Sequence, residues 1–386
     1  MPLRRPEAPQ QATFLELFFD LAFVLALAQL SHLLLDHLTW SGAAQTMVLL
    51  LAVWLNWTGT TWITDRLDQH WAPVQLLVMV SLLGSATLAA AVPEAFGKHG
   101  LIFAGVYVAT QLGRITFVMV IMRGHELERT ALRGLLWCGV SALPWIVGGF
   151  THGITRGVLW TLAVAADYAG HTLAYRRPGG GRKPASAPPP AAEHMAERYR
   201  QVFIIALGEL ILLSGLALSA SGFTLDKTAA FVVSIAATTL LWRIYIYRAG
   251  ELLPAAFSEA ESSTRVARWE VYVHLVMVAG VVVTTVGQVL VIEHPLGPTT
   301  PAWSVAIFGG PALFLAGRAG FEYTVFARVS WTRPIGILVL AALTPVMLVG
   351  SPLPAAIAVT AVLAGIAAAD AARARGRPPE RPSPPG

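Results

Sequence analysis

The stretch FLELFFDLAFVLALAQLSHLLL, residues 14–35, decides the fold class of this chain. It is apolar for most of its length and carries only two acidic residues, Glu16 and Asp20. A helix needs about 20 predominantly apolar residues to cross the hydrocarbon core of a bilayer. The stretch therefore predicts a transmembrane helix. Residues 1–12 before it are polar and contain proline, so we expect a short N-terminal tail and no cleavable signal peptide.

Runs of similar length and hydropathy recur along the whole chain. Of the 386 residues, 55% are hydrophobic and 13% are charged, whereas a soluble domain has about 25% charged residues. The sequence therefore predicts an all-α fold, a polytopic integral membrane helix bundle with about twelve transmembrane helices. The expected spans, with approximate ends, are 13–35, 42–63, 72–92, 101–122, 131–150, 154–175, 200–220, 228–248, 270–292, 303–325, 334–350 and 353–371.

The distribution of lysine and arginine sets the expected orientation. With the N-terminus inside, 21 of these residues fall on the cytoplasmic side, and three (Lys98, Arg156 and Lys227) fall outside. Cytoplasmic loops of membrane proteins carry such an excess. We therefore expect a multi-pass protein of the bacterial cytoplasmic membrane with both termini in the cytoplasm. The basic residues punctuate apolar segments and form no stripe, so the net charge of +5 does not indicate binding to nucleic acid.

A proline- and glycine-rich linker divides the predicted spans into six and six. We expect a cytoplasmic tail at 1–12, a first transmembrane half at 13–175, a cytoplasmic linker at 176–199, a second half at 200–371 and a cytoplasmic Pro/Arg-rich tail at 372–386.

Matching features recur in the same order in the two halves. The fourth predicted helix of each half carries a Gly-Arg pair, ending at Arg114 and Arg318, and the sixth carries a late aspartate, Asp167 and Asp370. This order predicts an internal duplication. Because each copy has six spans, the copies would be parallel, and proteins built in this way place their sites at the interface of the halves.

Charged and polar side chains inside the predicted spans are the candidates for function. A charge at the bilayer centre costs on the order of 3 kcal/mol on insertion scales, so it needs a partner, a cavity or a role. Glu16 and Asp20 share one helix face, because they are four residues apart. Glu209 lies near the middle of its span. The candidates for binding a substrate or ion are Glu16, Asp20, Gln29, His32, Asn56, Arg114, Glu197, Glu209 and Arg243.

Structural pairing is the alternative explanation for the same residues. Arg114 has no acid in its own helix and is expected to pair with Asp20 or Glu209. Arg318 and Glu322 are four residues apart and are expected to satisfy each other. In this interpretation the interior charges clamp helices together and carry no substrate.

No cofactor or metal is expected. Cys138 is the single cysteine, which excludes an internal disulfide and a cysteine-built metal site. His194 and Glu197 are three residues apart near the start of the seventh predicted helix, a spacing that could serve a metal. With so few ligands in view, helix capping and headgroup contact are the commoner outcome.

The motifs around these residues resemble the bacterial low-temperature-requirement A (LtrA) proteins. The resemblance rests on ELFFDLAFV at 16–24 with QLSH at 29–32, on WLNWTGTTWITDRLD at 54–68, and on HMAERY at 194–199 with IIALGE at 204–209. It spans nearly the whole chain. The chain departs from the family in having Leu210 where serine usually follows the glycine–glutamate pair. The resemblance implies a multi-pass membrane protein and implies no particular chemistry.

Two classes of function fit the predicted spans and charges, beside a scaffold role in membrane homeostasis. The first is a secondary transporter or permease, with or without proton coupling through Asp20 and Glu209, with membrane lipid and an unknown small molecule or ion as partners. The second is a membrane-embedded enzyme in which the same two carboxylates act as general acid and base on a lipid or isoprenoid-like substrate. Its apolar cavity would be lined by Phe18, Phe19, Trp54 and Trp57.

Overall fold

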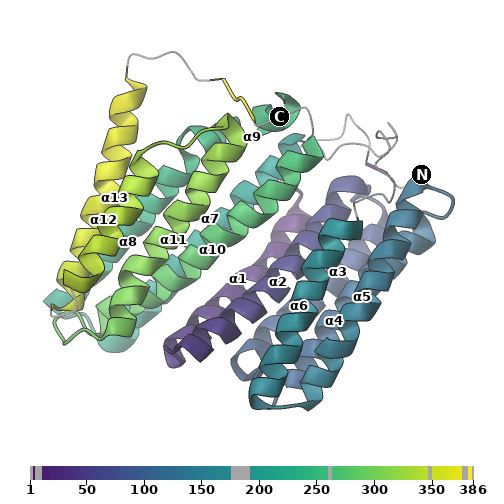
Figure 1. Cartoon of the computed structure of the whole chain (residues 1–386), viewed down its shortest axis with the longest axis horizontal. Helices are drawn as coiled ribbons and strands as arrows, with labels where there is room; N and C mark the ends of the chain where they lie inside the picture. The colour runs from purple at the N-terminus through teal and green to yellow at the C-terminus, as the bar shows by residue number, and fades with distance from the viewer. Residues whose placement is uncertain are drawn as a thin grey trace. The chain divides into compact units, whose positions relative to one another are not determined.

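The computed structural model of the chain describes residues 3–4, 11–174, 192–259, 263–346, 350–375 and 381–384. Helices dominate these residues, with one isolated β-bridge between Leu3 and Leu67. A short 3-10 turn follows α3, and a break, here called η2, separates α8 from α9. The helices are α1 (Phe14–Asp36), α2 (Trp40–Arg66), α3 (Ala72–Ala91), α4 (Gly100–Ile121), α5 (Glu126–Phe150), α6 (Gly153–Ala174), α7 (Ala192–Ser221), α8 (Leu225–Tyr245), η2 (Ile246–Gly250), α9 (Glu251–Glu259), α10 (Ser263–Glu293), α11 (Pro301–Phe326), α12 (Thr332–Val346) and α13 (Pro352–Ala374) (Figure 1).

The all-α prediction is confirmed, and every predicted run contains a helix. Ten helical segments in the described part of the chain are long and apolar enough to cross a membrane. Two of the twelve predicted spans fall outside that set. These are α6, which carries Arg156, Asp167 and His171, and α12, which has 15 residues and contains Pro345. The sequence did not predict the short helix α9.

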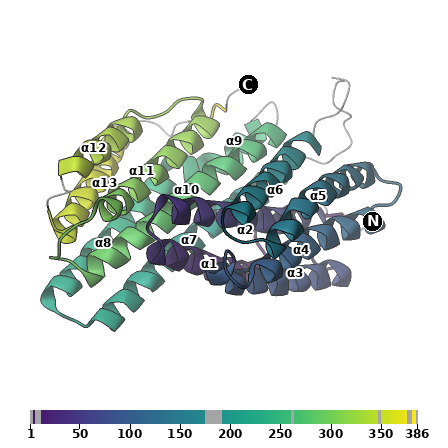
Figure 2. The ribbon, with the colours of Figure 1, turned by 60° about the horizontal axis from the view of Figure 1, so that its bottom comes forward.

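The chain divides into two compact units. The first unit comprises residues 1–33 and 41–191, and the second comprises residues 34–40 and 192–386. In the first unit α3, α4 and α5 lie side by side, and α5 also packs on α6 (Figure 2). In the second unit α11 contacts α12, and α13 contacts α8 and α12 (Figure 1). The predicted linker is described only from residue 192, where α7 begins before the expected apolar run.

Aromatic side chains form the core of the first unit between α4, α5 and α6. Trp145 and Trp160 are fully buried, with ring centroids 5.3 Å apart. Tyr107 of α4 packs on Trp145 at 4.8 Å. The Trp160 indole N–H donates to the backbone oxygen of Trp145 over 3.0 Å, so α5 and α6 are held in a fixed register. These contacts position the site described below.

Glycines let α10 and α11 approach closely in the second unit. A Cβ on Gly317 would lie 2.7 Å from the backbone nitrogen of Met277, and one on Gly287 would lie 2.9 Å from the Cα of Ile307. Membrane helices associate through such small residues, because water drives no hydrophobic association between helices inside a bilayer.

The break η2 interrupts the helix that α8 begins. Tyr247 and Arg248 have non-helical backbone angles, and the φ of Arg248 is 57°. A broken helix leaves carbonyls without intrahelical partners. Arg318 of α11 supplies donors: its Nε donates to the oxygen of Ile244 at 2.9 Å and its Nη2 to that of Tyr247 at 2.7 Å. The predicted Arg318–Glu322 pairing is therefore wrong, because Arg318 is turned to this backbone.

Candidate functional site

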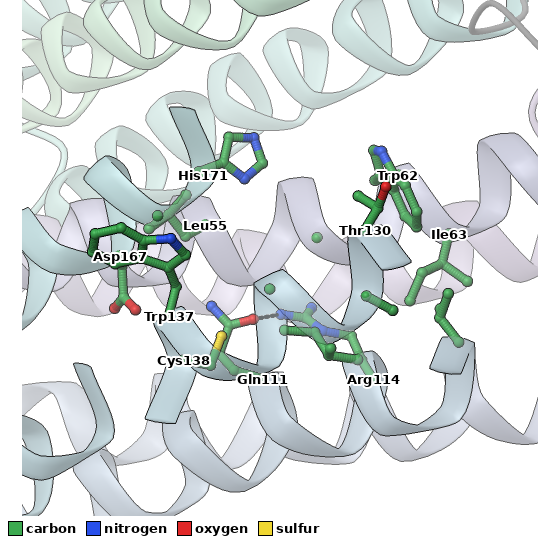
Figure 3. A pocket seen from close by; sticks show the side chains of 16 residues that line it. Leu55, Trp62, Ile63, Gln111, Arg114, Thr130, Trp137, Cys138, Asp167 and His171 are labelled. Atoms are coloured by element: carbon green, nitrogen blue, oxygen red, sulfur yellow. Dashed lines mark hydrogen bonds between the residues drawn. The ribbon is translucent and has the colours of Figure 1, made fainter. Parts of the chain in front are cut away.

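A pocket of about 140 Å³ lies inside the first unit, between α2, α4, α5 and α6. Its wall is largely apolar and aromatic, with a few polar and charged side chains. Figure 3 shows Trp137 and Asp167 toward one end, Arg114 and Trp62 toward the other, and Gln111 between the two ends. The lining residues are Leu55, Gly59, Trp62, Ile63, Gln111, Arg114, Ile115, Val118, Thr130, Ala131, Gly134, Trp137, Cys138, Asp167, Gly170 and His171.

The lining residues come from corresponding parts of four helices. The pocket uses the second halves of α2, α4 and α6 and the first half of α5. It therefore occupies the half of the first unit that contains the connection from α4 to α5.

Arg114 is buried, with 3% of its surface exposed, and its partners are neutral. Its Nη1 donates to the backbone oxygen of Asn56 and, at 2.7 Å, to the hydroxyl of Thr60, and its Nη2 donates to the side-chain oxygen of Gln111. Among the residues that the structure describes, no carboxylate lies within 4.0 Å of the guanidinium. The predicted acid partner, Asp20 or Glu209, is therefore wrong.

Gly59 of α2 makes the room that Arg114 needs. A Cβ at this position would lie 2.9 Å from Nη2 and 3.0 Å from Cζ of Arg114. The guanidinium therefore lies against the backbone of α2, which is why it reaches a main-chain carbonyl of that helix.

Asp167 is the acidic counterpart at the other end of the pocket, and it is also hydrogen bonded to neutral groups. Its Oδ2 accepts from the hydroxyl of Tyr107 at 3.0 Å and from the indole N–H of Trp145 at 2.9 Å. Within the described residues, no lysine or arginine nitrogen lies within 4.0 Å of this carboxylate.

Two neutral side chains connect the two charges. The amide nitrogen of Gln111 donates to the Tyr107 hydroxyl at 3.0 Å, while its amide oxygen accepts from Arg114. A continuous chain of three hydrogen bonds thus runs from Arg114 through Gln111 and Tyr107 to Asp167. The cation and the carboxylate line the same pocket, yet they are held apart.

The predicted residues of the first helix have different surroundings. Asp20 is fully buried and accepts from the indole N–H of Trp57 at 2.9 Å. Glu16 is buried and accepts from the backbone N–H of Thr13 at 3.0 Å. Gln29 is half-buried and His32 is exposed, so the polar candidates of this helix do not lie in one environment.

Asn56 links α2 to α3 beside the pocket. Its amide nitrogen donates to the hydroxyl of Ser85 at 2.7 Å, and its backbone oxygen accepts from Arg114. Asn56 also lines a second, much smaller cavity of about 10 Å³, together with Phe19, Phe23 and Trp57 among others. Neither Asp20 nor Glu209 lines either of these cavities.

The predicted residues of the second unit are held by local contacts. Glu209 is fully buried and accepts from the hydroxyl of Thr285 at 2.9 Å. Glu197 forms an ion pair with Arg200 at 3.0 Å. Arg243 lies over the ring of Tyr247, 5.1 Å from its centroid. A cavity shared by Asp20 and Glu209 would join residues of different units, and it stays a prediction.

Two buried polar clusters of the second unit were not predicted. Arg333 of α12 pairs with Asp370 of α13 at 2.7 Å and with Glu322 of α11 at 3.5 Å. In α10, Glu270 and His274 form a fully buried pair at 3.0 Å, and the other ring nitrogen of His274 lies 3.1 Å from the hydroxyl of Tyr245. Both clusters join helices to each other.

Sequence reasoning identified Arg114 and Asn56 as candidates but did not include Tyr107, Gln111 or Asp167 among the site residues. The spacing of Tyr107 and Gln111 and of Asp167 and His171, four residues in each case, is the signal that places each pair on one helix face. Within the described part of the chain, no group of three or more His, Cys, Asp or Glu residues is arranged to hold a metal ion.

Comparison with known proteins places this arrangement in a family. A family model described as "Bacterial low temperature requirement A protein (LtrA)" matches residues 11–368. The chain is 34% identical over 344 residues to "Uncharacterized protein RA0937" of Rhizobium meliloti (strain 1021), an alignment that covers 88% of this chain and 84% of the relative. No solved structure matches. Since the family model covers almost all of the chain, including every residue of the pocket, the protein belongs to the bacterial LtrA family.

Proposed function

We propose that this protein is a secondary transporter or permease, and that its solute binds in the pocket of the first unit. The observation that carries the proposal is the pair of separated charges, Arg114 and Asp167, lining one pocket inside a bundle of membrane helices. Charges at such depth are costly and mark substrate or ion pathways in membrane proteins. A purely structural pair would be expected to contact each other, and these two contact neutral groups instead.

Proton coupling follows from the same chain of hydrogen bonds. Asp167 is held by the hydroxyl of Tyr107 and the indole of Trp145, and both donors suit its ionised form. Tyr107 and Gln111 connect it to Arg114, where an anionic group would bind. Binding of a solute at Arg114 would thus change the electrostatic potential at Asp167. Solute binding would in this way be coupled to proton exchange at the Asp167 carboxylate. Asp20 and Glu209, buried with hydroxyl or indole donors, are proposed as further proton sites.

The full proposal includes twelve spans with both termini in the cytoplasm. It is supported by the 21-to-3 distribution of basic residues and by a helix at each of the twelve predicted positions. In this topology the end of α4 and the start of α5 are cytoplasmic. The pocket would therefore lie in the cytoplasmic half of the membrane.

A parallel duplication is also part of the proposal, and a repeated contact supports it. In each half the arginine of the fourth predicted helix donates to a backbone oxygen of the second: Arg114 to Asn56, and Arg318 to Ile244. In each half the sixth predicted helix carries a buried aspartate, Asp167 or Asp370.

The test compares solutes and lipids inside and outside cells that carry the parent protein, no protein, or a variant with a filled pocket. Gly134→Leu fills the pocket, because Gly134 lines it and a Cβ there meets only Ile115, at 3.7 Å. Gly139→Leu, on the exposed side of the same helix, is the matched control. We expect a solute whose distribution depends on the parent and on Gly139→Leu, and not on Gly134→Leu.

A change in lipid composition with no change in any solute gradient would refute transport and favour the enzyme. An unchanged profile in all strains would refute both.

A further inference from the structure

We propose that the pocket takes a small zwitterion whose carboxylate and ammonium groups are several bonds apart, with the carboxylate at Arg114 and the ammonium at Asp167. This inference rests on the proposed function and specifies its substrate class. It follows from the donors that Arg114 retains, from the surroundings of Asp167, and from the two neutral side chains that stand between them.

The Arg114 end is suited to a carboxylate. A guanidinium has five N–H donors, and the hydrogen bonds to Asn56, Thr60 and Gln111 use two on Nη1 and one on Nη2. Among the described residues this leaves one N–H on Nε and one on Nη2. Charged N–H groups of this kind form strong hydrogen bonds to carboxylate oxygens.

The Asp167 end is suited to a cation. The carboxylate lines the pocket and has no lysine or arginine nitrogen within 4.0 Å in the described residues. Trp137 lines the same pocket and packs against Gly170, which is in the same helix as Asp167. Aromatic faces attract ammonium groups, so a ligand ammonium here would meet both a negative charge and an indole ring.

The separation of Arg114 and Asp167 determines how far apart the carboxylate and ammonium groups of the ligand must be. Gln111 and Tyr107 lie between these two residues in the chain of three hydrogen bonds that joins Arg114 to Asp167. We therefore expect the ligand to have several bonds between its charged groups, whereas an α-amino acid carries both groups on one carbon. The pocket of about 140 Å³ resembles in size a cavity of about 150 Å³ that holds benzene in another protein, so the ligand is small.

Charge balance favours a zwitterion over simpler ligands of the same size. A plain anion would neutralise Arg114 and need a proton on Asp167, and a plain amine would neutralise Asp167 and leave Arg114 without an anion. A zwitterion satisfies both ends and adds no net charge within the bilayer, where an uncompensated charge is costly.

The experiment measures the thermal unfolding midpoint, Tm, of the purified full-length protein in detergent with four probes. These are 4-aminobutyrate, butyrate, butylammonium and alanine at equal concentrations. A ligand that binds only the folded state raises Tm in a saturable way. We expect a rise of several degrees with 4-aminobutyrate and a smaller or absent rise with the other three. Equal shifts with butyrate or alanine, or none with any probe, would overturn the inference.

Variants make the assignment specific. Gly134→Leu should abolish the shift, and the control Gly139→Leu should keep it. Asp167→Asn should make 4-aminobutyrate and butyrate equivalent, because the ammonium then has no carboxylate to meet. A 4-aminobutyrate shift that survives in both Gly134→Leu and Asp167→Asn would place binding elsewhere and refute the assignment.

Failure of this inference can be told from failure of the proposed function. If no probe shifts Tm but cells still show a solute gradient that Gly134→Leu removes, the substrate class is wrong and the transporter stands. If neither effect occurs, both are wrong.

Discussion

Arg114 keeps a charge inside the first unit by hydrogen bonding to neutral oxygens. A buried charge without a counterion is costly, and removal of a single partner from a buried pair typically costs about 3–5 kcal/mol. Here no such pair exists for Arg114 in the described residues, and the cost is offset by three hydrogen bonds to Asn56, Thr60 and Gln111. Arg114 can therefore bind an anion, and for this reason we assign it to solute binding.

Tyr107 is the residue whose removal tests the chain between the two charges. Tyr107→Phe keeps the ring on Trp145 and deletes one hydroxyl, which accepts from Gln111 and donates to Asp167. We expect a stability loss of about 1 kcal/mol, as for a typical hydrogen bond, together with strongly reduced solute transport. Denaturant unfolding in detergent and solute distribution in cells measure the two effects.

Tyr168→Phe is the matched control for this change. It removes a hydroxyl that donates to the backbone oxygen of Leu51 at 3.3 Å, outside the chain of hydrogen bonds. It should leave transport unchanged. Normal transport by Tyr107→Phe would contradict the assigned role of the chain.

Single residues of the site could be predicted only in part. The sequence identifies Arg114 as a charge within an apolar helix, because that requires only local composition. It cannot identify Asn56 or Gly59 as neighbours, since they come from another helix whose rotation is set by packing. The same limit explains why Arg114 was expected to pair with Asp20 or Glu209, whereas its hydrogen bonds go to neutral groups.

At the scale of elements, packing of α10 on α11 depends on glycines at backbone contact. The expected helix over 270–292 is confirmed as part of α10, yet hydropathy alone gives no indication of which face meets α11. Gly317 lies where a Cβ would be 2.7 Å from Met277 N and 2.9 Å from Val273 O. Rigid main-chain atoms cannot move aside as a flexible side chain can.

Gly317→Ala should therefore destabilise the protein. Alanine gains up to about 1 kcal/mol of helix propensity over glycine, but overpacking typically costs about 1–3 kcal/mol. The control is Gly309→Ala in the same helix, whose Cβ would meet only Val305, at an ordinary 3.8 Å. Unfolding in detergent should show a lower midpoint for Gly317→Ala and an equal or higher one for Gly309→Ala. The same midpoint for both variants would contradict the close approach.

The break η2 shows what hydropathy misses at this scale. Residues 228–257 are apolar enough to suggest a simple span and loop. The sequence has no proline at Tyr247 or Arg248 that would indicate a break in the helix. The interruption is instead stabilised from outside by Arg318, which binds two carbonyls that the helix leaves open. Such a contact depends on the neighbouring helix and cannot be predicted from the segment itself.

At the scale of the whole molecule, the predicted topology is open to a direct test. We expect cysteines placed singly at Ala185 and Arg377, in a Cys138→Ala background, to react with impermeant reagents only from the cytoplasmic side. A cysteine at Ser221, the last residue of α7, should react from the outside. Ala185 and Arg377 lie outside the described residues, and their placement follows from the charge distribution alone. Labelling of Ala185Cys from the periplasm would refute the orientation.

The central claim is that a solute passes through the pocket of the first unit, and Cys138 reports on it directly. This single cysteine of the chain lines the pocket. The measurement is its modification by a small, membrane-impermeant methanethiosulfonate, added to one side at a time of sealed vesicles of known orientation. Cys138→Ala is the blank and Gly134→Leu the filled pocket. A transporter must expose its site to each side in turn, so the account predicts modification of the parent from both sides and protection in Gly134→Leu. Modification from one side only, or equal modification of Gly134→Leu, would contradict it.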